Sequence, residues 1–392
     1  MSEYFEHDND GISIGLIEKK FHTMAEPPDE LILASGARLG PITVAYETMG
    51  TLNADKSNVI LIAHALSGDS HVAGYYSIAD PKPGWWDIMV GPGKGIDTNK
   101  YYVICSNVLG GCMGTTGPSS TNPATGRPYG LDFPMVTIGD MVKVQKALLD
   151  YLGINKLLAV VGGSIGGMQV IEWTINYPEM VTAAIMLATT TRHSALAIAF
   201  NEIGRQAIMS DPHFNKGDYY SGPKPDLGLA LARMVGHVTY LSDEAMRSKF
   251  GRRLQDRDNL AFDFEANFQV ESYLRYQGSK FVQRFDANSF LYITKAADYF
   301  DVGCQHGNNS EVDAFAGVTA KILAISFTSD WLYPTYQSRD MVKAMKKNGL
   351  DVSFCEIEAK CGHDAFLLPN ERQSTLISRF LKRVSEEEHH AL

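Results

Sequence analysis

Short runs of apolar residues recur along the chain and alternate with segments of helical periodicity. The runs have the length of β-strands and are rich in β-branched residues. Several contain no alternating polar positions, which is typical of parallel strands that are buried on both faces. Seven such runs are predicted as strands: residues 42–50, 58–66, 101–109, 157–163, 182–189, 321–327 and 351–357.

The segments between these runs carry apolar residues at three- and four-residue spacing. Residues 140–154, 168–178 and 338–349 are predicted as helices, which end near Gly153, at Pro178 and near Gly349 respectively. Alternation of strand and helix predicts an α/β protein with a doubly wound, mostly parallel sheet.

Residues 192–312 break this alternation. The interval is too long for a connection without structure of its own, and no strand pattern is found in it. Two segments in it, 194–211 and 245–256, are predicted as helices. We therefore expect a core formed by residues 1–191 and 313–392, with 192–312 as a helical insertion over one edge of the sheet. The final stretch, EEEHHAL, is expected to be frayed.

Composition excludes several classes of function. The chain has 392 residues, of which 45% are hydrophobic, and a net charge of −10. An acidic surface attracts neither nucleic acid nor an anionic membrane, so we expect neither as a partner. The N-terminal MSEYFEHDND is too acidic for a signal peptide. No apolar stretch approaches the roughly 18 residues of a membrane helix, and we expect a soluble, cytoplasmic protein.

The distribution of cysteine and histidine argues against disulfides and metal sites. The five cysteines are scattered and form no C-x-x-C pair, which favours free thiols in a reducing compartment. His64 and His71 lack a carboxylate or cysteine at ligand spacing. We expect neither a metal nor a permanently bound cofactor.

One turn carries the strongest chemical signal. Residues 162–166, GGSIG, fit the motif G-x-S-x-G, with a predicted strand before it and a helix after it. In that context the hydroxyl of Ser164 projects at the carboxyl edge of the sheet as a nucleophile. A phosphate-binding loop is the alternative, but no lysine follows at the required spacing and the glycines do not match G-x-G-x-x-G.

A serine nucleophile needs a base and a carboxylate that orients the base. In folds of this type these residues follow in the order Asp, then His, each after a later strand. Asp330 follows the run 321–327, and His363 follows the run 351–357. Asp301 with His306 is an alternative pair, but it lies within the insertion and follows no strand.

An oxyanion hole requires two backbone amides near the serine. The amide of Ile165 is one candidate, and that of Leu66, in the loop after the run 58–66, is the other. These groups together indicate acyl transfer through a covalent ester. They leave open whether water or another nucleophile accepts the acyl group, so both an esterase and an acyltransferase fit.

Blocks spread over nearly the whole chain resemble the homoserine O-acetyltransferase family. They are AHALSGDSHVAG (63–74), GWWDIMVGPGKGIDT (84–98), SNVLGGCMGTTGPSS (106–120), GGSIGGMQVIEW (162–173), ARMVGHVTYLS (232–242), FGRRLQ (250–255), ESYLRYQG (271–278), SDWLYP (329–334) and GHDAFLL (362–368). The resemblance implies an α/β-hydrolase fold with a helical lid and a homodimer formed through that lid. It also implies acetyl transfer from acetyl-CoA to L-homoserine in methionine biosynthesis.

Carried over residue by residue, the resemblance gives Ser164, His363 and Asp330 the roles of nucleophile, base and acid. It adds Arg233 as the partner of the homoserine carboxylate and Asp364 as the partner of its ammonium group. Tyr240 is expected to line the same site.

On sequence alone these last three residues have simpler interpretations. Arg233 fits an exposed helix surface, Asp364 fits a helix N-cap, and Tyr240 fits ordinary aromatic packing. Ile165 stands where the family commonly has methionine. This difference does not affect the role expected of Ile165, because only its backbone amide is used. A succinyl-CoA donor, an L-serine acceptor, a plain esterase and a non-catalytic binding protein remain as alternatives.

Overall fold

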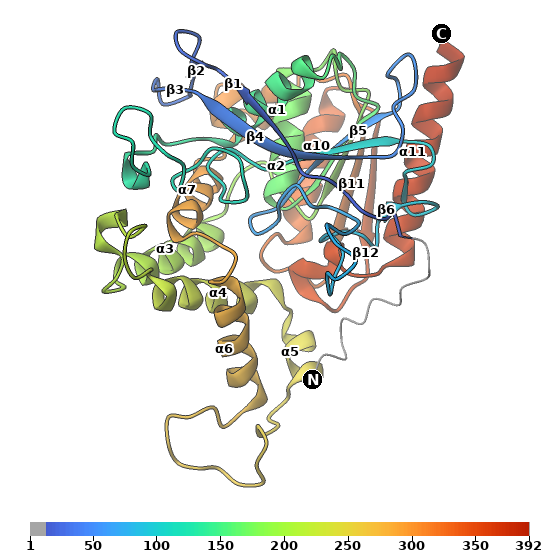
Figure 1. The fold of residues 1–392 in the computed structure, drawn as a ribbon. Coiled ribbons are helices and arrows are strands. Elements are labelled where there is room, and N and C mark those ends of the chain that lie inside the picture. Colours follow the sequence, from blue (N-terminus) through green and yellow to red (C-terminus); the bar gives the residue numbers. More distant parts are fainter. Residues whose placement is uncertain (1–12, 392) are drawn as a thin grey trace.

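An eight-stranded sheet forms the centre of the molecule (Figure 1). The computed structural model describes residues 13–391, so the expectation about the N-terminal MSEYFEHDND lies outside the described residues. The strand order is β1-β4-β8-β5-β9-β10-β11-β12. The strands are β1 (Lys20–Met24), β4 (Ile42–Met49), β5 (Val59–Ala63), β8 (Tyr102–Ser106), β9 (Ala159–Gly163), β10 (Ala183–Leu187), β11 (Lys321–Phe327) and β12 (Val352–Ile357).

The sheet is parallel from β8 to β12, whereas β4 runs antiparallel to both β8 and β1. All seven predicted strands are confirmed, and so is the mostly parallel α/β class. The edge strand β1 was missed because its sequence, KFHTM, is mostly polar and largely exposed. Two separate small pairs join β2 (Leu31–Ile32) to β3 (Arg38–Leu39) and β6 (Val90–Gly91) to β7 (Ile96–Asp97).

Both faces of the sheet are covered, which explains the uninterrupted apolar runs. Val59 and Leu61 of β5 belong to one core cluster, which also includes side chains of α1 (Ile138–Tyr151), α2 (Ile165–Asn176) and α10 (Thr335–Lys347). Ile60 and Ile62 belong to a second cluster, to which α11 (Glu371–Ala391) contributes. Burial on both faces is the arrangement expected of parallel strands between helical layers.

The three helices predicted in the core are confirmed, and the expectation for the C-terminus is wrong. Helix α1 begins with a capping box between Thr137 and Asp140 and ends before Gly153, whose φ is +64°. The stretch EEEHHAL was expected to be frayed, but α11 continues to Ala391. Glu387 pairs with Lys321 at the start of β11, and Glu388 pairs with Lys156, three residues before β9, so the last turns of the helix contact the sheet.

Residues 192–312 contain helices and no strand. These are α3 (Ala195–Met209), α4 (Asp226–Tyr240), α5 (Asp243–Lys249), α6 (Gln269–Phe281), α7 (Ala287–Asp298), α8 (Val302–His306) and α9 (Glu311–Ala314), with the 3-10 turn η2 (Asn215–Gly217). In Figure 1, α3 to α6 project beyond the sheet. The assignment of 192–312 as a separate insertion stays a prediction, and α9 spans its proposed end.

The helix predicted over 245–256 is only half correct. Helix α5 ends at Lys249, and the chain turns at Gly251, whose φ of +54° lies in the left-handed region. Glycine adopts that conformation readily after a helix, so the helix does not continue into the apolar residues beyond Gly251. No helix within residues 13–391 is both long and apolar enough to cross a membrane.

Candidate active site

Ser164 lies on a sharp turn between β9 and α2. Its backbone has φ 57° and ψ −125°, an unusual conformation for a residue with a side chain, and its N–H donates to the Leu187 oxygen over 3.0 Å. The turn is possible because its neighbours are glycines. A Cβ on Gly162 would lie 2.4 Å from the Gly166 oxygen, and a Cβ on Gly166 would lie 2.1 Å from the oxygen of Ala63. The start of α2 therefore packs directly against the end of β5.

The fold brings the three predicted catalytic side chains together. The Ser164 hydroxyl lies 2.9 Å from Nε2 of His363, and Nδ1 of His363 lies 2.8 Å from Oδ2 of Asp330. The three residues are between 3% and 8% exposed, so water competes little for these hydrogen bonds. They follow β9, β11 and β12, whose carboxyl ends meet at one edge of the sheet.

Backbone contacts fix the orientation of the Asp330 carboxylate. Its Oδ1 accepts hydrogen bonds from the amides of Leu332 and Tyr333, at 3.0 and 2.9 Å, which leaves Oδ2 for the imidazole. Burial alone lowers the pKa of His363. The charge of Asp330 and its hydrogen bond, together with the charge of Asp364, more than offset that effect and raise the pKa above its ordinary value of 6.5.

The two amides predicted for the oxyanion hole lie on segments that contact each other. Ile165 is the first residue of α2, so its N–H has no partner within the helix. Within residues 13–391, the Leu66 amide donates no hydrogen bond to the protein. The Gln169 side chain of α2 donates to the His64 oxygen over 3.1 Å and ties the helix to the loop that carries Leu66.

The histidines of this loop have structural partners. Nε2 of His64 accepts a hydrogen bond from the Val108 amide, and burial lowers the pKa of its ring. Nδ1 of His71 lies 2.9 Å from the buried carboxylate of Glu47. Within the described part of the chain, no group of three or more His, Cys, Asp or Glu side chains is placed to hold a metal ion. All five cysteines, each within that part, are free thiols.

Arg233 projects from α4 toward the loop after β5. Its guanidinium lies 3.5 Å from the Ser67 hydroxyl and 4.7 Å from the ring centre of Phe281. Among the described residues, no carboxylate lies within ion-pairing distance of it. The side chain is partly buried, so the interpretation of Arg233 as an ordinary surface residue is wrong.

Asp364 and Tyr240 lie close to the base: Asp364 follows His363 directly in the chain, and its charge raises the pKa of His363. Asp364 is partly buried, and within residues 13–391 its carboxylate forms no hydrogen bond or ion pair; burial raises its pKa. It lies inside the turn η3 (Gly362–Leu367), whose N-cap is Cys361, so the N-cap interpretation is wrong. The ring centre of Tyr240 lies 6.2 Å from that of His363.

Two further residues at this site carried no motif of their own. Tyr333 packs with its ring centre 5.0 Å from that of His363. Arg284, after α6, donates to the Ser67 oxygen over 2.9 Å, so two arginines contact the same residue. Tyr333 lies within the SDWLYP block, but nothing in the sequence pattern gave it a role. Arg284 lies outside every block quoted above.

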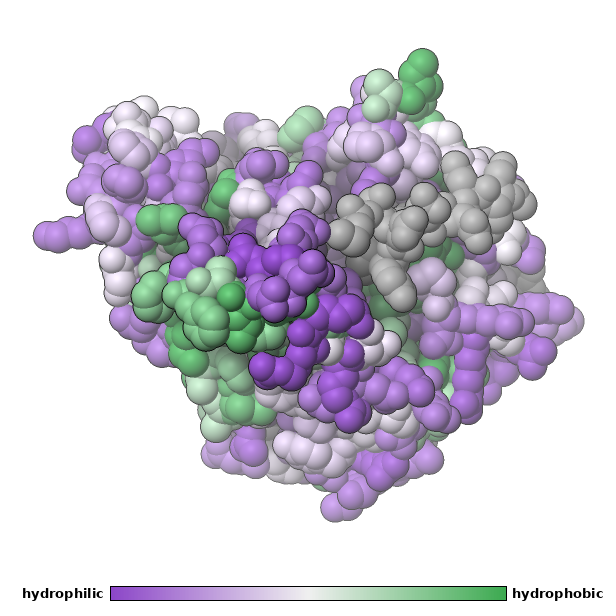
Figure 2. Space-filling model, turned by 90° about the horizontal axis from the view of Figure 1, so that it is seen from below, coloured by the Kyte–Doolittle hydropathy of each residue, from purple (hydrophilic) through white to green (hydrophobic). Residues whose placement is uncertain are grey.

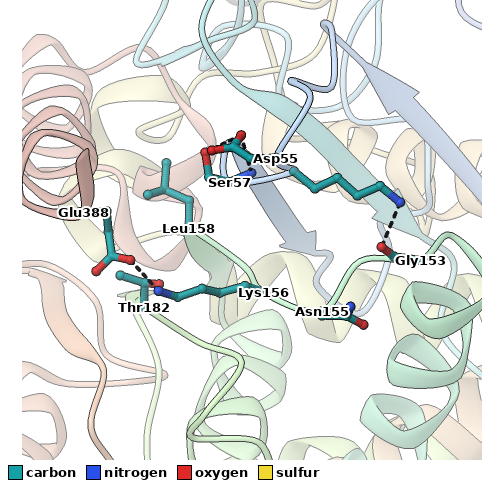
Figure 3. Close-up of a pocket in the computed structure, with 9 residues that line it drawn as sticks. Asp55, Ser57, Gly153, Asn155, Lys156, Leu158, Thr182 and Glu388 are labelled. Carbon is teal, nitrogen blue, oxygen red and sulfur yellow. Dashed lines mark hydrogen bonds and ion pairs between the residues drawn. The ribbon is translucent and has the colours of Figure 1, made fainter. Parts of the chain in front are cut away.

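A pocket of about 270 Å³ opens at the other edge of the sheet, before β5, β9 and β10 (Figure 3). It is lined by Asp55, Lys56, Ser57, Gly153, Asn155, Lys156, Leu158, Thr182 and Glu388. Its two lysines already have partners: Lys56 donates to the Gly153 oxygen, and Lys156 pairs with Glu388. The pocket has no nucleophile–base pair and lies apart from Ser164.

The chain matches the family model of the α/β-hydrolase fold over residues 58–369. It is 66% identical, over 98% of its length and 97% of the relative's, to homoserine O-acetyltransferase of Solidesulfovibrio magneticus. The solved homoserine O-acetyltransferase of Bacillus anthracis superimposes with a TM-score of 0.86 and 32% identity, covering 93% of this chain and 98% of that one. Esterase E22 superimposes with a TM-score of 0.85 and 35% identity, covering 93% of this chain and 100% of that one.

Proposed function

The chain belongs to the α/β-hydrolase fold family and, within it, to the homoserine O-acetyltransferases, and we propose that it transfers the acetyl group of acetyl-CoA to the hydroxyl of L-homoserine. The observation that carries the proposal is the arrangement of charged side chains around the hydrogen-bonded Ser164, His363 and Asp330. Asp364 follows His363 directly in the chain, and the Arg233 guanidinium lies 5.5 Å from the ring centre of Tyr240, which in turn lies 6.2 Å from that of His363. The three hydrogen-bonded residues account for acyl transfer. The unpaired arginine and carboxylate account for an amino acid as acceptor.

In the first half of the reaction Ser164 is acylated. His363 accepts the proton of the Ser164 hydroxyl, and the serine oxygen attacks the thioester carbonyl. The amides of Leu66 and Ile165 stabilise the oxyanion of the tetrahedral intermediate. The carbon–sulfur bond then breaks, the proton on His363 passes to the sulfur, and CoA leaves as a thiol.

In the second half L-homoserine accepts the acetyl group. The Arg233 guanidinium offers two parallel donors to the substrate carboxylate, and Asp364 binds the ammonium group. Tyr240 lies beside the base and lines the same site. His363 takes the proton of the homoserine hydroxyl as its oxygen attacks the acetyl ester, and it returns that proton to Ser164. The two half-reactions form a ping-pong cycle without a permanently bound cofactor.

The main rival is a plain esterase, and the structural similarity to esterase E22 makes it specific. The same nucleophile, base and acid serve hydrolysis, so these three residues cannot separate the two activities. Arg233 and Asp364 favour the transferase, because hydrolysis needs no cation and anion beside the base. Succinyl-CoA as donor and L-serine as acceptor are further variants on the same site.

The surface of the helical region supports a homodimer. Leu227, Leu231 and Val238 share one face of α4 and are 70%, 50% and 41% exposed. Phe262 and Phe264, in the loop before α6, are almost fully exposed. Figure 2, which views this end of the molecule, shows hydrophobic residues gathered beside strongly hydrophilic ones. Exposed apolar side chains of this kind mark interaction surfaces, and a second copy of the chain is the partner we propose for them.

We place the reaction in methionine biosynthesis, because O-acetylation activates the homoserine side chain for a later replacement of its oxygen by sulfur. We place the protein in the cytoplasm, because free thiols suit a reducing compartment.

The proposed function is tested by competition. The purified protein receives equal acetyl-CoA and succinyl-CoA with L-homoserine, and mass spectrometry identifies the products. O-acetylhomoserine is the expected product. O-succinylhomoserine would change the donor, and free acetate without acylated homoserine would replace the proposal by an esterase.

A further inference from the structure

Three buried polar side chains form one line of hydrogen bonds that ends at the loop after β5. The indole Nε1 of Trp173 lies 2.7 Å from Oε1 of Gln145, and Nε2 of Gln145 lies 2.7 Å from Oε1 of Gln169. Nε2 of Gln169 lies 3.1 Å from the backbone oxygen of His64. Gln145 belongs to α1, whereas Gln169 and Trp173 belong to α2, and all three are at most 2% exposed. The line therefore lies inside the core, where water does not compete with its hydrogen bonds.

The chemistry of the two ends fixes the direction of every hydrogen bond in this line. An indole N–H can only donate, so the atom of Gln145 that faces Trp173 is the amide oxygen. The NH2 group of Gln145 then donates to the oxygen of Gln169, which leaves the NH2 group of Gln169 facing His64. A backbone carbonyl can only accept, so this last contact is satisfied as well. No titratable group takes part, and the direction does not depend on pH.

The line ends one peptide group before the Leu66 amide. The oxygen of Ala65 belongs to the same peptide group as the Leu66 N–H. This oxygen accepts hydrogen bonds from the Gly68 amide over 3.0 Å and from Nδ1 of His64 over 2.8 Å. A trans peptide is planar, and its N–H points away from its C=O. These bonds therefore orient the Leu66 N–H, and Gln169 holds the peptide group directly before it.

The same NH2 group of Gln169 also contacts the segment that carries the second amide. Nε2 of Gln169 lies 3.4 Å from the oxygen of Ile165, the first residue of α2. The two segments approach each other closely, because a Cβ on Gly166 would lie 2.1 Å from the oxygen of Ala63. One side chain thus bridges the loop that carries Leu66 and the helix end that carries Ile165.

We propose that Gln169 sets the spacing between the Leu66 and Ile165 amides and thereby the shape of the oxyanion hole. Gln145 and Trp173 hold the amide of Gln169 in its donating orientation. Gln169 acts through the two backbone amides, so it is a positioning residue. The oxyanion forms only as the thioester is attacked, so a displaced amide weakens the transition state and leaves the binding of acetyl-CoA unchanged.

The variant Gln169→Met tests this role. Methionine keeps an unbranched side chain of similar length and removes both hydrogen-bonding groups. The measured quantity is the single-turnover rate at which acetyl-CoA acylates the protein, followed by mass spectrometry. At saturating acetyl-CoA this rate should fall about tenfold, because loss of a whole oxyanion donor costs about 10²- to 10³-fold and a displaced donor costs less. The acetyl-CoA concentration at half of the maximal rate should stay within about twofold of wild type. A maximal rate within about twofold of wild type overturns the proposal.

Thr174→Val is the matched control. Thr174 is buried on the same helix, and its hydroxyl donates to the Ile171 oxygen over 2.8 Å. This variant also removes one buried hydrogen bond from α2, but that bond does not reach the loop after β5. The acylation rate of Thr174→Val should therefore equal that of wild type. An equal loss of rate in both variants means that the rate follows the packing of α2 in general, and it overturns the proposal.

Two further measurements separate a displaced amide from a damaged triad. A trifluoromethyl ketone analogue of acetyl-CoA adds to a serine as a hemiketal oxyanion. Its inhibition constant should rise in Gln169→Met by the same factor by which acylation slows. The acid limb of the pH–rate profile reports the protonation of His363 and should not move. An unchanged inhibition constant beside a slower acylation, or a displaced acid limb, overturns the proposal.

Gln145→Met tests the orientation of Gln169. This variant removes the donor to the Gln169 oxygen and should slow acylation less than Gln169→Met does. Gln145 acts only through Gln169, so the double variant should be no slower than Gln169→Met alone, and losses that multiply overturn the proposal. If Gln169→Met does not fold, Gln145→Met decides. A rate about two- to fivefold below wild type with an unmoved acid limb supports the proposal, and the wild-type rate or a displaced limb overturns it.

This role of Gln169 rests on the proposed function, in which Ser164 is acylated through an oxyanion. A wild-type protein that forms no acyl-serine contradicts the proposed function itself. A wild-type protein that is acylated, together with an undiminished rate in Gln169→Met, contradicts only the role of Gln169.

Discussion

Replacement of Arg233 by methionine tests the assignment of the substrate carboxylate. Methionine keeps an unbranched apolar stem over the ring of Phe281, which lies 4.7 Å from the guanidinium, and removes the charge. No carboxylate of residues 13–391 pairs with Arg233, so its donors are available to a ligand. Two charge-assisted hydrogen bonds are lost in a partly desolvated site, at a cost of about 3 kcal/mol. The KM for L-homoserine should therefore rise roughly 150-fold.

The two half-reactions give this prediction its control. Acylation of Ser164 by acetyl-CoA involves no homoserine carboxylate, so its rate should change less than about threefold in Arg233→Met. Arg127→Ala, at an exposed arginine, should change neither quantity.

A substrate that lacks the carboxylate completes the test. 3-Aminopropan-1-ol should be a poor acceptor for the wild-type enzyme, and Arg233→Met should make it no worse. A homoserine KM that stays within threefold of wild type, or an equal loss with both acceptors, would refute the assignment of Arg233.

Three further substitutions test the chemistry and the packing of the site. Ser164→Ala should slow acylation by at least about 10⁴-fold, and retention of a tenth of the rate would exclude the covalent route. The raised pKa of His363 means that activity grows as pH rises through a value above 6.5, where the base loses its proton. Asp330→Asn should move this acid limb to lower pH, and an unmoved limb in the pH–rate profile would contradict the charge effect. Because the pKa of His363 is raised in the folded protein, its protonation adds folding stability that is fully present below pH 6.5. This stability is lost as pH rises through the raised pKa, so Asp330→Asn should lower the melting temperature most in acid. Gly166→Ala places a Cβ 2.1 Å from a carbonyl oxygen of β5 and should destabilise the fold by about 2–3 kcal/mol in thermal melts, whereas Gly317→Ala, with open space around it, should not.

The sequence was informative wherever local pattern and position decide the structure. The apolar runs located the seven core strands, and the glycines around Ser164 located the tight turn after β9. Asp330 and His363 could be selected because parallel strands present their carboxyl ends at one edge, so residues far apart in sequence meet there.

The rest of the site depends on packing that no local pattern encodes. Arg284 follows α6 and reaches Ser67 only because the helical region lies over the sheet. Tyr333 follows β11, and its ring packs on His363, which follows β12. Polar residues in an amphipathic helical region carry no signal that distinguishes solvent from a buried partner.

The central claim is that Ser164 carries the acetyl group from CoA to L-homoserine. The most direct test is mass spectrometry of the wild-type protein after brief mixing with acetyl-CoA alone. The account predicts a mass gain of one acetyl group, located by peptide analysis on Ser164, and its loss on addition of L-homoserine with formation of O-acetylhomoserine. An unmodified Ser164 under turnover conditions, or an acetyl group that homoserine does not remove, would contradict it.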